Sequence, residues 1–107
     1  MFRKGDQGKG TETLPGIHRK TLCHGEKTLM AGFRIEQGAL LPRHSHPHEQ
    51  TGYLVSGRLQ LHIGNETWIA EAGDSWCIPG GTEHEARALS ETIAIEVFAP
   101  SREDYRD

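Results

Sequence analysis

The chain has 107 residues and a formal net charge of −3, with lysine and arginine spread along its length. This length fits a single domain, and the absence of a basic stripe argues against nucleic-acid binding. No apolar run reaches the 18 residues that a membrane span needs, so no membrane contact is expected. The polar N-terminus lacks the apolar core of a secretory signal, which makes the cytoplasm the expected location.

The first 13 residues are rich in glycine and in charged side chains. Beyond Met1 they contain one large apolar residue, Phe2. A segment of this composition buries too little apolar surface to offset the entropy of ordering it. Residues 1–13 are therefore expected to be a flexible N-terminal arm, and residues 14–107 a single folded domain.

From Ile17 onward the sequence predicts short strands joined by turns. Leu59, Leu61 and Ile63 alternate with polar residues, which is typical of a half-buried strand. Glycine or proline stands near most junctions, and no long segment shows a helical period. An all-β sandwich or barrel is therefore expected. The predicted strands are 17–23, 28–36, 50–56, 58–63, 67–70, 75–78, 85–89 and 92–98, and residues 101–107 form one turn or stay loose.

Histidines occupy alternate positions in the segment 38–50. In extended backbone, alternate residues face the same side, so His44 and His46 can direct two imidazoles to one point. A further histidine, His84, follows the turn Pro79-Gly80-Gly81. Because neutral imidazole is a preferred ligand of divalent transition metals, these segments predict a metal site.

The two segments together resemble the two motifs of the cupin superfamily. The first motif, G-x5-H-x-H-x3-E-x6-G, is matched by Gly38, His44, His46 and Gly57, with Gln50 in place of glutamate. The second, G-x5-P-x-G-x2-H-x3-N, is matched by Gly73, Pro79, Gly81 and His84, with Ala88 in place of asparagine. The resemblance implies a double-sheet jelly-roll barrel that holds a metal in its mouth. It also implies a homodimer that pairs through the first strands.

The expected metal ligands are His44, His46, Gln50 and His84. Glu49 is the nearby carboxylate, but if Gln50 points into the barrel then Glu49 points out. Gly57 also stands at the distance from Gln50 that the superfamily motif requires of a ligand. His48 shares the parity of His44 and His46, and Pro47 leaves its direction open. His48 therefore remains an alternative ligand, and a metal-free cupin remains an alternative reading.

The expected ligand set is electrically neutral. Three imidazoles and an amide leave the full charge of a divalent ion in place, so the site should attract an anion. Zinc, nickel, iron or manganese suit these ligands, copper is also compatible, and the sequence does not choose among them.

A second set of polar residues lies near the C-terminus. If Ile95 and Val97 pack outward, Glu96 and Phe98 face inward, and Arg102 can fold over the mouth of the barrel. A carboxylate that faces a cavity is costly unless it is paired or functional. From composition alone, a solvated Glu96 and a charged tail remain the simpler interpretation.

With the histidine motif and the Pro-Gly-Gly turn, this set resembles the small cupins of pectin and alginate degradation. That resemblance implies conversion of 4,5-unsaturated monouronates, small anionic sugar acids, into the linear keto form. It also implies catalytic or substrate-binding roles for Glu96, Phe98 and Arg102. The acid is more usually aspartate in that family, so Glu96 is a departure that bears on the substrate. A metal-dependent dioxygenase and a non-catalytic sugar-acid-binding cupin are the alternative functions.

Overall fold

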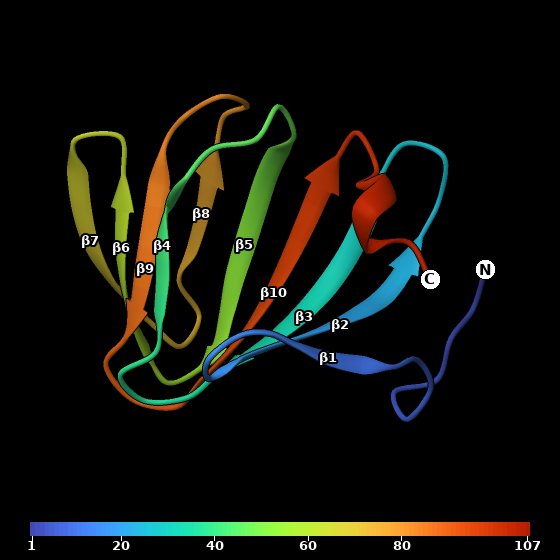
Figure 1. Cartoon of the computed structure of the whole chain (residues 1–107), viewed down its shortest axis with the longest axis horizontal. Helices are drawn as coiled ribbons and strands as arrows, with labels where there is room; N and C mark the ends of the chain where they lie inside the picture. Colours follow the sequence, from blue (N-terminus) through green and yellow to red (C-terminus); the bar gives the residue numbers. More distant parts are fainter.

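The computed structural model describes residues 1–107 and contains two antiparallel sheets that face each other (Figure 1). The larger sheet has, in spatial order, β1 (Gly10–Leu14), β2 (Ile17–His24), β3 (Leu29–Ile35), β10 (Thr92–Ala99), β5 (Glu49–Ser56) and β8 (Ser75–Ile78). The smaller sheet has β4 (Leu40–His44), β9 (His84–Ala88), β6 (Arg58–Ile63) and β7 (Glu66–Glu71). The all-β, double-sheet prediction is confirmed.

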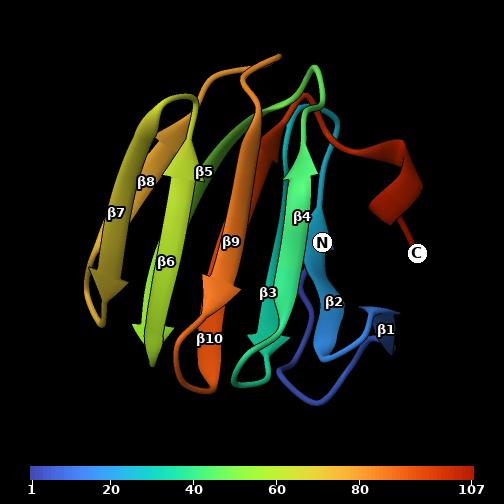
Figure 2. The same cartoon turned by 60° about the vertical axis from the view of Figure 1, so that its left-hand side comes forward.

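Figure 2 shows the smaller sheet in front of the larger one, with the strands of both running in similar directions. Alternate residues of each strand point into the space between the sheets. On β10 the inward residues Ala94, Glu96 and Phe98 are buried, while Ile93, Ile95 and Val97 are only partly buried. The inward direction predicted for Glu96 and Phe98 is therefore confirmed.

The apolar core lies between the two sheets. Leu54 from β5, Leu59 and Leu61 from β6 and Ala94 from β10 belong to one buried cluster. The alternation predicted for residues 58–63 puts Leu59 and Leu61 inside and leaves His62 partly exposed. Gly57 joins β5 to β6 with a positive φ of 95°, and a Cβ there would lie 2.3 Å from the carbonyl oxygen of Glu91. Any larger residue would force these strands apart.

The segment predicted to be a flexible N-terminal arm, residues 1–13, overlaps the first strand of the structure. β1 begins at Gly10 and pairs with β2, with Gly10 opposite Lys20 and Glu12 opposite His18. All five residues of β1 are exposed, so backbone hydrogen bonds rather than side-chain burial hold this strand. Strand pairing through backbone hydrogen bonds needs no apolar residues. The polar composition of residues 10–13 therefore gave no sign of this strand.

The chain ends in a short 3-10 helix, η1 (Glu103–Tyr105), which packs back against the larger sheet. The peptide oxygen of Tyr105 accepts a hydrogen bond from the Thr21 hydroxyl. The single C-terminal turn is one of the two outcomes expected for residues 101–107. No helix here has the length and hydrophobicity needed to cross a membrane.

Candidate metal centre

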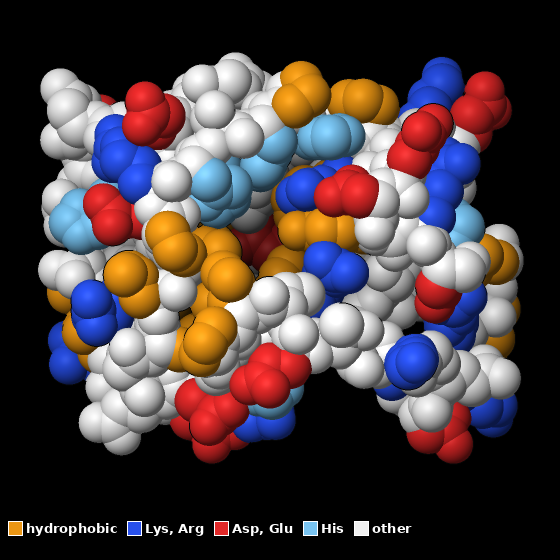
Figure 3. Space-filling view, in the orientation of Figure 1, with side chains coloured by type: hydrophobic (Ala, Val, Ile, Leu, Met, Phe, Trp, Pro, Cys, Tyr) orange, Lys and Arg blue, Asp and Glu red, His pale blue; other side chains and the backbone are white.

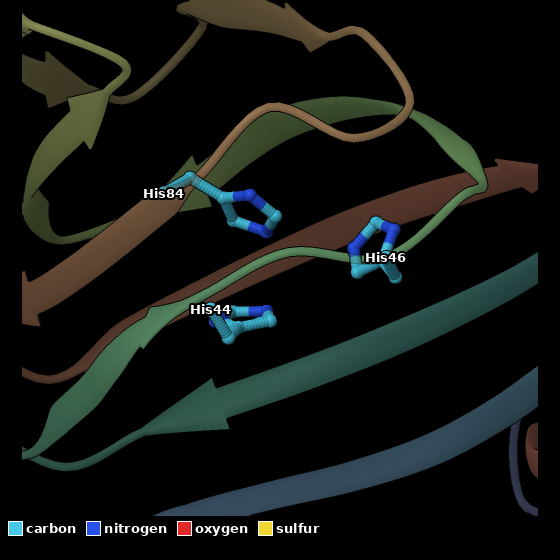
Figure 4. Close-up of side chains that lie close together, drawn as sticks. All are labelled: His44, His46 and His84. Carbon is cyan, nitrogen blue, oxygen red and sulfur yellow. The ribbon is translucent and has the colours of Figure 1, made fainter.

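Three histidine side chains from three separate segments point toward one another (Figure 4). His44 ends β4, His84 begins β9, and His46 lies in the loop between β4 and β5. The ring centroids of His44 and His84 are 4.2 Å apart, and that of His46 lies 5.0 Å from His84 and 5.7 Å from His44. One ring nitrogen from each side chain lies within 4.8 Å of the others. The predicted convergence of His44, His46 and His84 is therefore confirmed.

Strand pairing and a glycine turn bring the histidines together. β4 runs antiparallel to β9, and this register puts His44 directly opposite His84. The amide of Gly81 donates to the carbonyl of His46 at 2.8 Å, which ties the β8–β9 turn to the β4–β5 loop. A Cβ at Gly80 would lie 2.3 Å from the carbonyl oxygen of Pro47, so only glycine permits this approach.

Each of the three imidazoles is oriented by a backbone carbonyl. The Nδ1 atoms of His44, His46 and His84 lie 2.8, 3.0 and 2.9 Å from the carbonyl oxygens of Pro42, His48 and Thr82, respectively. A carbonyl oxygen only accepts, so Nδ1 carries the proton and the neutral ring has its lone pair on Nε2. Metal-binding histidines in proteins are commonly held by such a hydrogen bond on the other ring nitrogen.

Two further observations fit a bound cation. The Nε2 atom of His84 is buried and has no hydrogen-bond partner. Burial lowers the pKa of His84 to about 4, and burial followed by the charge of Arg102 lowers the pKa of His46, so neither ring favours a second proton. A neutral, unpartnered imidazole nitrogen in a buried pocket is suited to ligate a metal ion.

Gln50 from β5 lies beside the histidines and is buried. Its Oε1 atom is 3.0 Å from His46 Nε2, and its amide nitrogen donates to Glu96 Oε2 at 2.7 Å. With Nδ1 of His46 protonated, two electron-pair donors face each other across this gap. Two ligands about 2.1 Å from one ion and at right angles also lie about 3 Å apart, so this pair fits a shared cation.

The two alternative ligands lie outside this cluster. His48 is partly buried, its ring centroid lies 5.7 Å from that of His46, and it is not among the histidines that converge. Glu49 is exposed on the outer face of β5, next to the buried Gln50, as its parity predicted.

Glu96 lies deep in the barrel, with 8% of its surface exposed. Burial raises the pKa of its carboxyl group to about 8, and interactions with Gln50 and Trp76 oppose this increase. The group can therefore hold a proton near neutral pH, although a cation bound nearby would lower its pKa. Phe98, two residues further along β10, is also buried, and its ring centroid lies 5.8 Å from that of His46.

Arg102 follows β10 and stacks on two aromatic rings. Its guanidinium carbon lies 3.8 Å from the ring centroid of Tyr105 and 5.0 Å from that of Phe98. Two of its nitrogens donate to the carboxylate of Asp104, at 3.2 and 2.8 Å. The sequence analysis did not identify Asp104 and Tyr105 as partners of Arg102. Their positions two and three residues after Arg102 could have indicated these contacts.

Figure 3 shows a hollow near the middle of one face, bordered by histidine, hydrophobic and basic side chains. Inside the barrel lies a narrow cavity of about 50 Å³ whose lining includes Gln50, His84, Glu96 and Trp76, together with apolar core residues. The polar lining brings a candidate acid–base group and a candidate metal ligand into one confined space. Trp76 is a wall residue that the sequence analysis did not single out.

Comparison with known proteins agrees with this geometry. Residues 32–99 match the family described as Cupin domain. An RmlC-like cupin from Shewanella frigidimarina is 28% identical with a TM-score of 0.93, and the match covers 98% of this chain and 95% of that protein. KdgF from Halomonas sp. is 29% identical with a TM-score of 0.93, and the match covers 99% and 98% of the two chains.

More distant structures share only the fold. Oxalate decarboxylase from Bacillus subtilis is 19% identical with a TM-score of 0.73, and the match covers 87% of this chain and 27% of that one. No curated protein sequence matches this chain significantly. The family match spans more than half of the sequence and includes His44, His46, Gln50 and His84, so the chain belongs to the cupin family.

Proposed function

We propose that this cupin is a metal-dependent enzyme that opens the ring of 4,5-unsaturated monouronates and yields the linear keto acid. The observation that carries the proposal is the buried carboxylate of Glu96 beside Gln50 and the three histidines. The likeness to KdgF, at 29% identity over nearly the whole of both chains, supports the same reading.

His44, His46, His84 and Gln50 would hold one divalent ion, which we propose to be zinc, nickel, iron or manganese. When bound, such an ion supplies a Lewis acid that polarises an oxygen of the substrate. All four side chains are neutral ligands, so the centre keeps a positive charge that favours an anionic sugar acid.

The reaction is an isomerisation in two proton-transfer stages. In the first, the bond between C1 and the ring oxygen breaks, the C1 hydroxyl loses its proton to give an aldehyde, and the ring oxygen gains one to give an enol. In the second, the enol oxygen loses its proton while C4 gains one, which leaves a ketone at C5. Both stages need an acid–base group at a fixed position.

Glu96 is the proposed acid–base group. Because burial raises its pKa to about 8, it can both donate and accept a proton near neutral pH. Phe98 provides an apolar wall beside His46. Arg102 is the proposed carboxylate-binding residue, since a planar guanidinium suits bidentate recognition, and its stacking on Tyr105 holds it at the site.

The direct test measures loss of absorbance of the unsaturated uronate with and without protein, because the substrate also opens spontaneously. We expect Glu96→Gln to reduce the catalysed rate by about 10²–10⁴-fold, the usual contribution of a positioned acid–base group, while metal content stays unchanged. Equal rates in the variant and the native protein would remove Glu96 from the mechanism.

The alternative functions give different results in the same experiment. Oxygen consumption that depends on bound iron would favour a dioxygenase. Tight uronate binding without turnover would favour a non-catalytic sugar-acid-binding cupin. The homodimer and the cytoplasmic location stay predictions, and sedimentation of the purified chain tests the first of them.

A further inference from the structure

Trp76 lies next to the metal centre but is not part of the ligand set or the proposed acid–base machinery. The register of the larger sheet pairs Trp76 of β8 with Gly52 of β5, and Gly52 with Glu96 of β10. The three residues therefore form one row across the inner face of the sheet. Trp76 also lines both the narrow interior cavity and a larger hollow of about 700 Å³ at the edges of β7 and β8.

Gly52 leaves room for the indole to cross β5. A Cβ at this position would lie 2.2–2.5 Å from the indole atoms Cε2, Nε1 and Cζ2 of Trp76. Any side chain at residue 52 would therefore displace the ring, and without one the indole lies close against the backbone of β5. The polar ring atom Nε1 is among the atoms closest to Gly52, and Glu96 pairs with Gly52 from the neighbouring strand β10.

The Nε1 atom of the indole is buried and has no hydrogen-bond partner. An unsatisfied buried donor destabilises the fold, so a nearby acceptor should capture it. Glu96 offers the acceptor, because it lies in the same row across Gly52 and lines the same interior cavity as Trp76.

We propose that Trp76 is a positioning residue that acts on the metal centre through Glu96 and Gln50. In this role its indole N–H would turn to donate to a carboxyl oxygen of Glu96, and Glu96 already accepts from the amide nitrogen of Gln50. With its NH₂ group held by Glu96, the Gln50 side chain keeps its amide oxygen toward His46. The inference rests on the metal centre of the proposed function but not on its substrate or reaction.

The orientation of the Gln50 amide matters because its two ends have the same shape and opposite chemistry. The oxygen can ligate a cation, whereas the NH₂ group is a donor that cannot. The Oε2 atom of Glu96 accepts from the NH₂ group, and this contact favours the orientation in which the oxygen faces the histidines. Groups that orient metal ligands in this way commonly change metal affinity by about 10–100-fold when they are removed.

The contact between Trp76 and Glu96 is tested directly by the proton–nitrogen NMR signals of the indole groups. The chain has two tryptophans, and Trp68 is 55% exposed and serves as an internal control. We expect the Trp76 signal to resist exchange with solvent, to shift in Glu96→Ala, and to shift less in Glu96→Gln, which keeps an acceptor oxygen. A Trp76 signal that stays in place in Glu96→Ala would overturn the proposal.

The effect on the metal centre is tested by competition between metal-free protein and a coloured chelator for added zinc. We expect Trp76→Phe and Gly52→Ala each to weaken zinc affinity by about 10-fold or more, and Trp68→Phe to leave it unchanged. Benzothienylalanine at residue 76 keeps the ring shape without the N–H, so it serves if Trp76→Phe does not fold. Native zinc affinity in this folded analogue would refute the role of the N–H.

The zinc measurement separates this proposal from the proposed function. If the native protein does not act on uronates but loses zinc affinity when the indole N–H is removed, the proposed reaction fails and the positioning role of Trp76 stands. If uronate turnover is present and zinc affinity does not depend on residue 76, the positioning role fails alone.

Discussion

The inner faces of β5 and β10 carry two different surfaces along the same pair of strands. Leu54 and Ala94 lie opposite each other and belong to the apolar core, with at most 1% of their surface exposed. A few residues away on the same face, Gln50 and Glu96 are also buried but polar, and they hydrogen-bond to each other. The Leu54–Ala94 pair marks the apolar end of these two strands and the Gln50–Glu96 pair marks the polar end. Both ends are inaccessible to solvent, so burial alone does not distinguish the core from the site.

The difference between the two ends is energetic. The Leu54 end stabilises the fold, because transfer of apolar surface from water is favourable. The Glu96 end costs stability, since a carboxylate in the interior must be neutralised, paired or compensated by a cation. We therefore expect substitutions at the two ends to have opposite effects on function and on stability.

The sharpest separation is expected from His84→Ala at the polar end. Loss of one imidazole ligand should reduce metal affinity and uronate turnover by more than about 100-fold. The metal-free variant should unfold at nearly the same urea concentration as the metal-free native protein, because the substitution also removes a buried nitrogen that has no partner. Metal content by mass spectrometry and urea unfolding measure the two effects, and unchanged metal content would contradict the assignment.

At the apolar end, Leu54→Ala should show the reverse. Leu54 is fully buried, and removal of its methyl groups should lower the free energy of unfolding by about 2–5 kcal/mol. The folded fraction should keep near-native zinc affinity, because the substitution does not touch a ligand. Urea unfolding and zinc competition on one sample test this, and a large loss of affinity would show that the two ends are coupled.

The pH dependence of stability provides a third comparison. Folded Glu96 keeps its proton up to about pH 8, while its ordinary pKa is 4.5, so the folded state binds more protons between these values. The pKa of His84, lowered from 6.5 to about 4, acts in the opposite direction below pH 6.5. Metal-free protein should therefore lose about 1–2 kcal/mol of stability as the pH rises from 6.5 to 8.

Urea unfolding of chelator-treated protein at these two pH values measures the loss. Glu96→Gln should remove most of it, because glutamine does not titrate. An equal loss in native protein and in Glu96→Gln would show that another group is responsible.

The smallest effect is expected at the mouth of the barrel, where Arg102→Lys tests the specific shape of the guanidinium. Lysine keeps the charge but neither stacks as a plane on Tyr105 nor pairs with Asp104 through two nitrogens. We expect the KM for the uronate to rise about 10-fold, as for the loss of one charge-assisted hydrogen bond, with little change in kcat. An unchanged KM in steady-state kinetics would remove Arg102 from substrate binding.

Strand patterning by itself predicted an all-β sandwich or barrel and allowed Glu96 and Phe98 to face inward together, because a period of two along a strand is local in the chain. The resemblance to the two cupin motifs, through fixed spacings of histidine, glycine and proline, implied the double sheet and the convergence of His44, His46 and His84. The parity of β5 likewise separated Gln50 from Glu49 before any coordinates were needed.

Only the tertiary structure decided which residues lie side by side across strands. The pairing of β1 with β2, the row of Trp76, Gly52 and Glu96, and the stacking of Arg102 on Tyr105 all depend on it. Each of these features joins residues that are far apart in the sequence or that no local pattern places together. The physical reason is that strand order and register decide which residues become lateral neighbours in a sheet. The alternating pattern of one strand is compatible with several partners and registers, so it does not specify them.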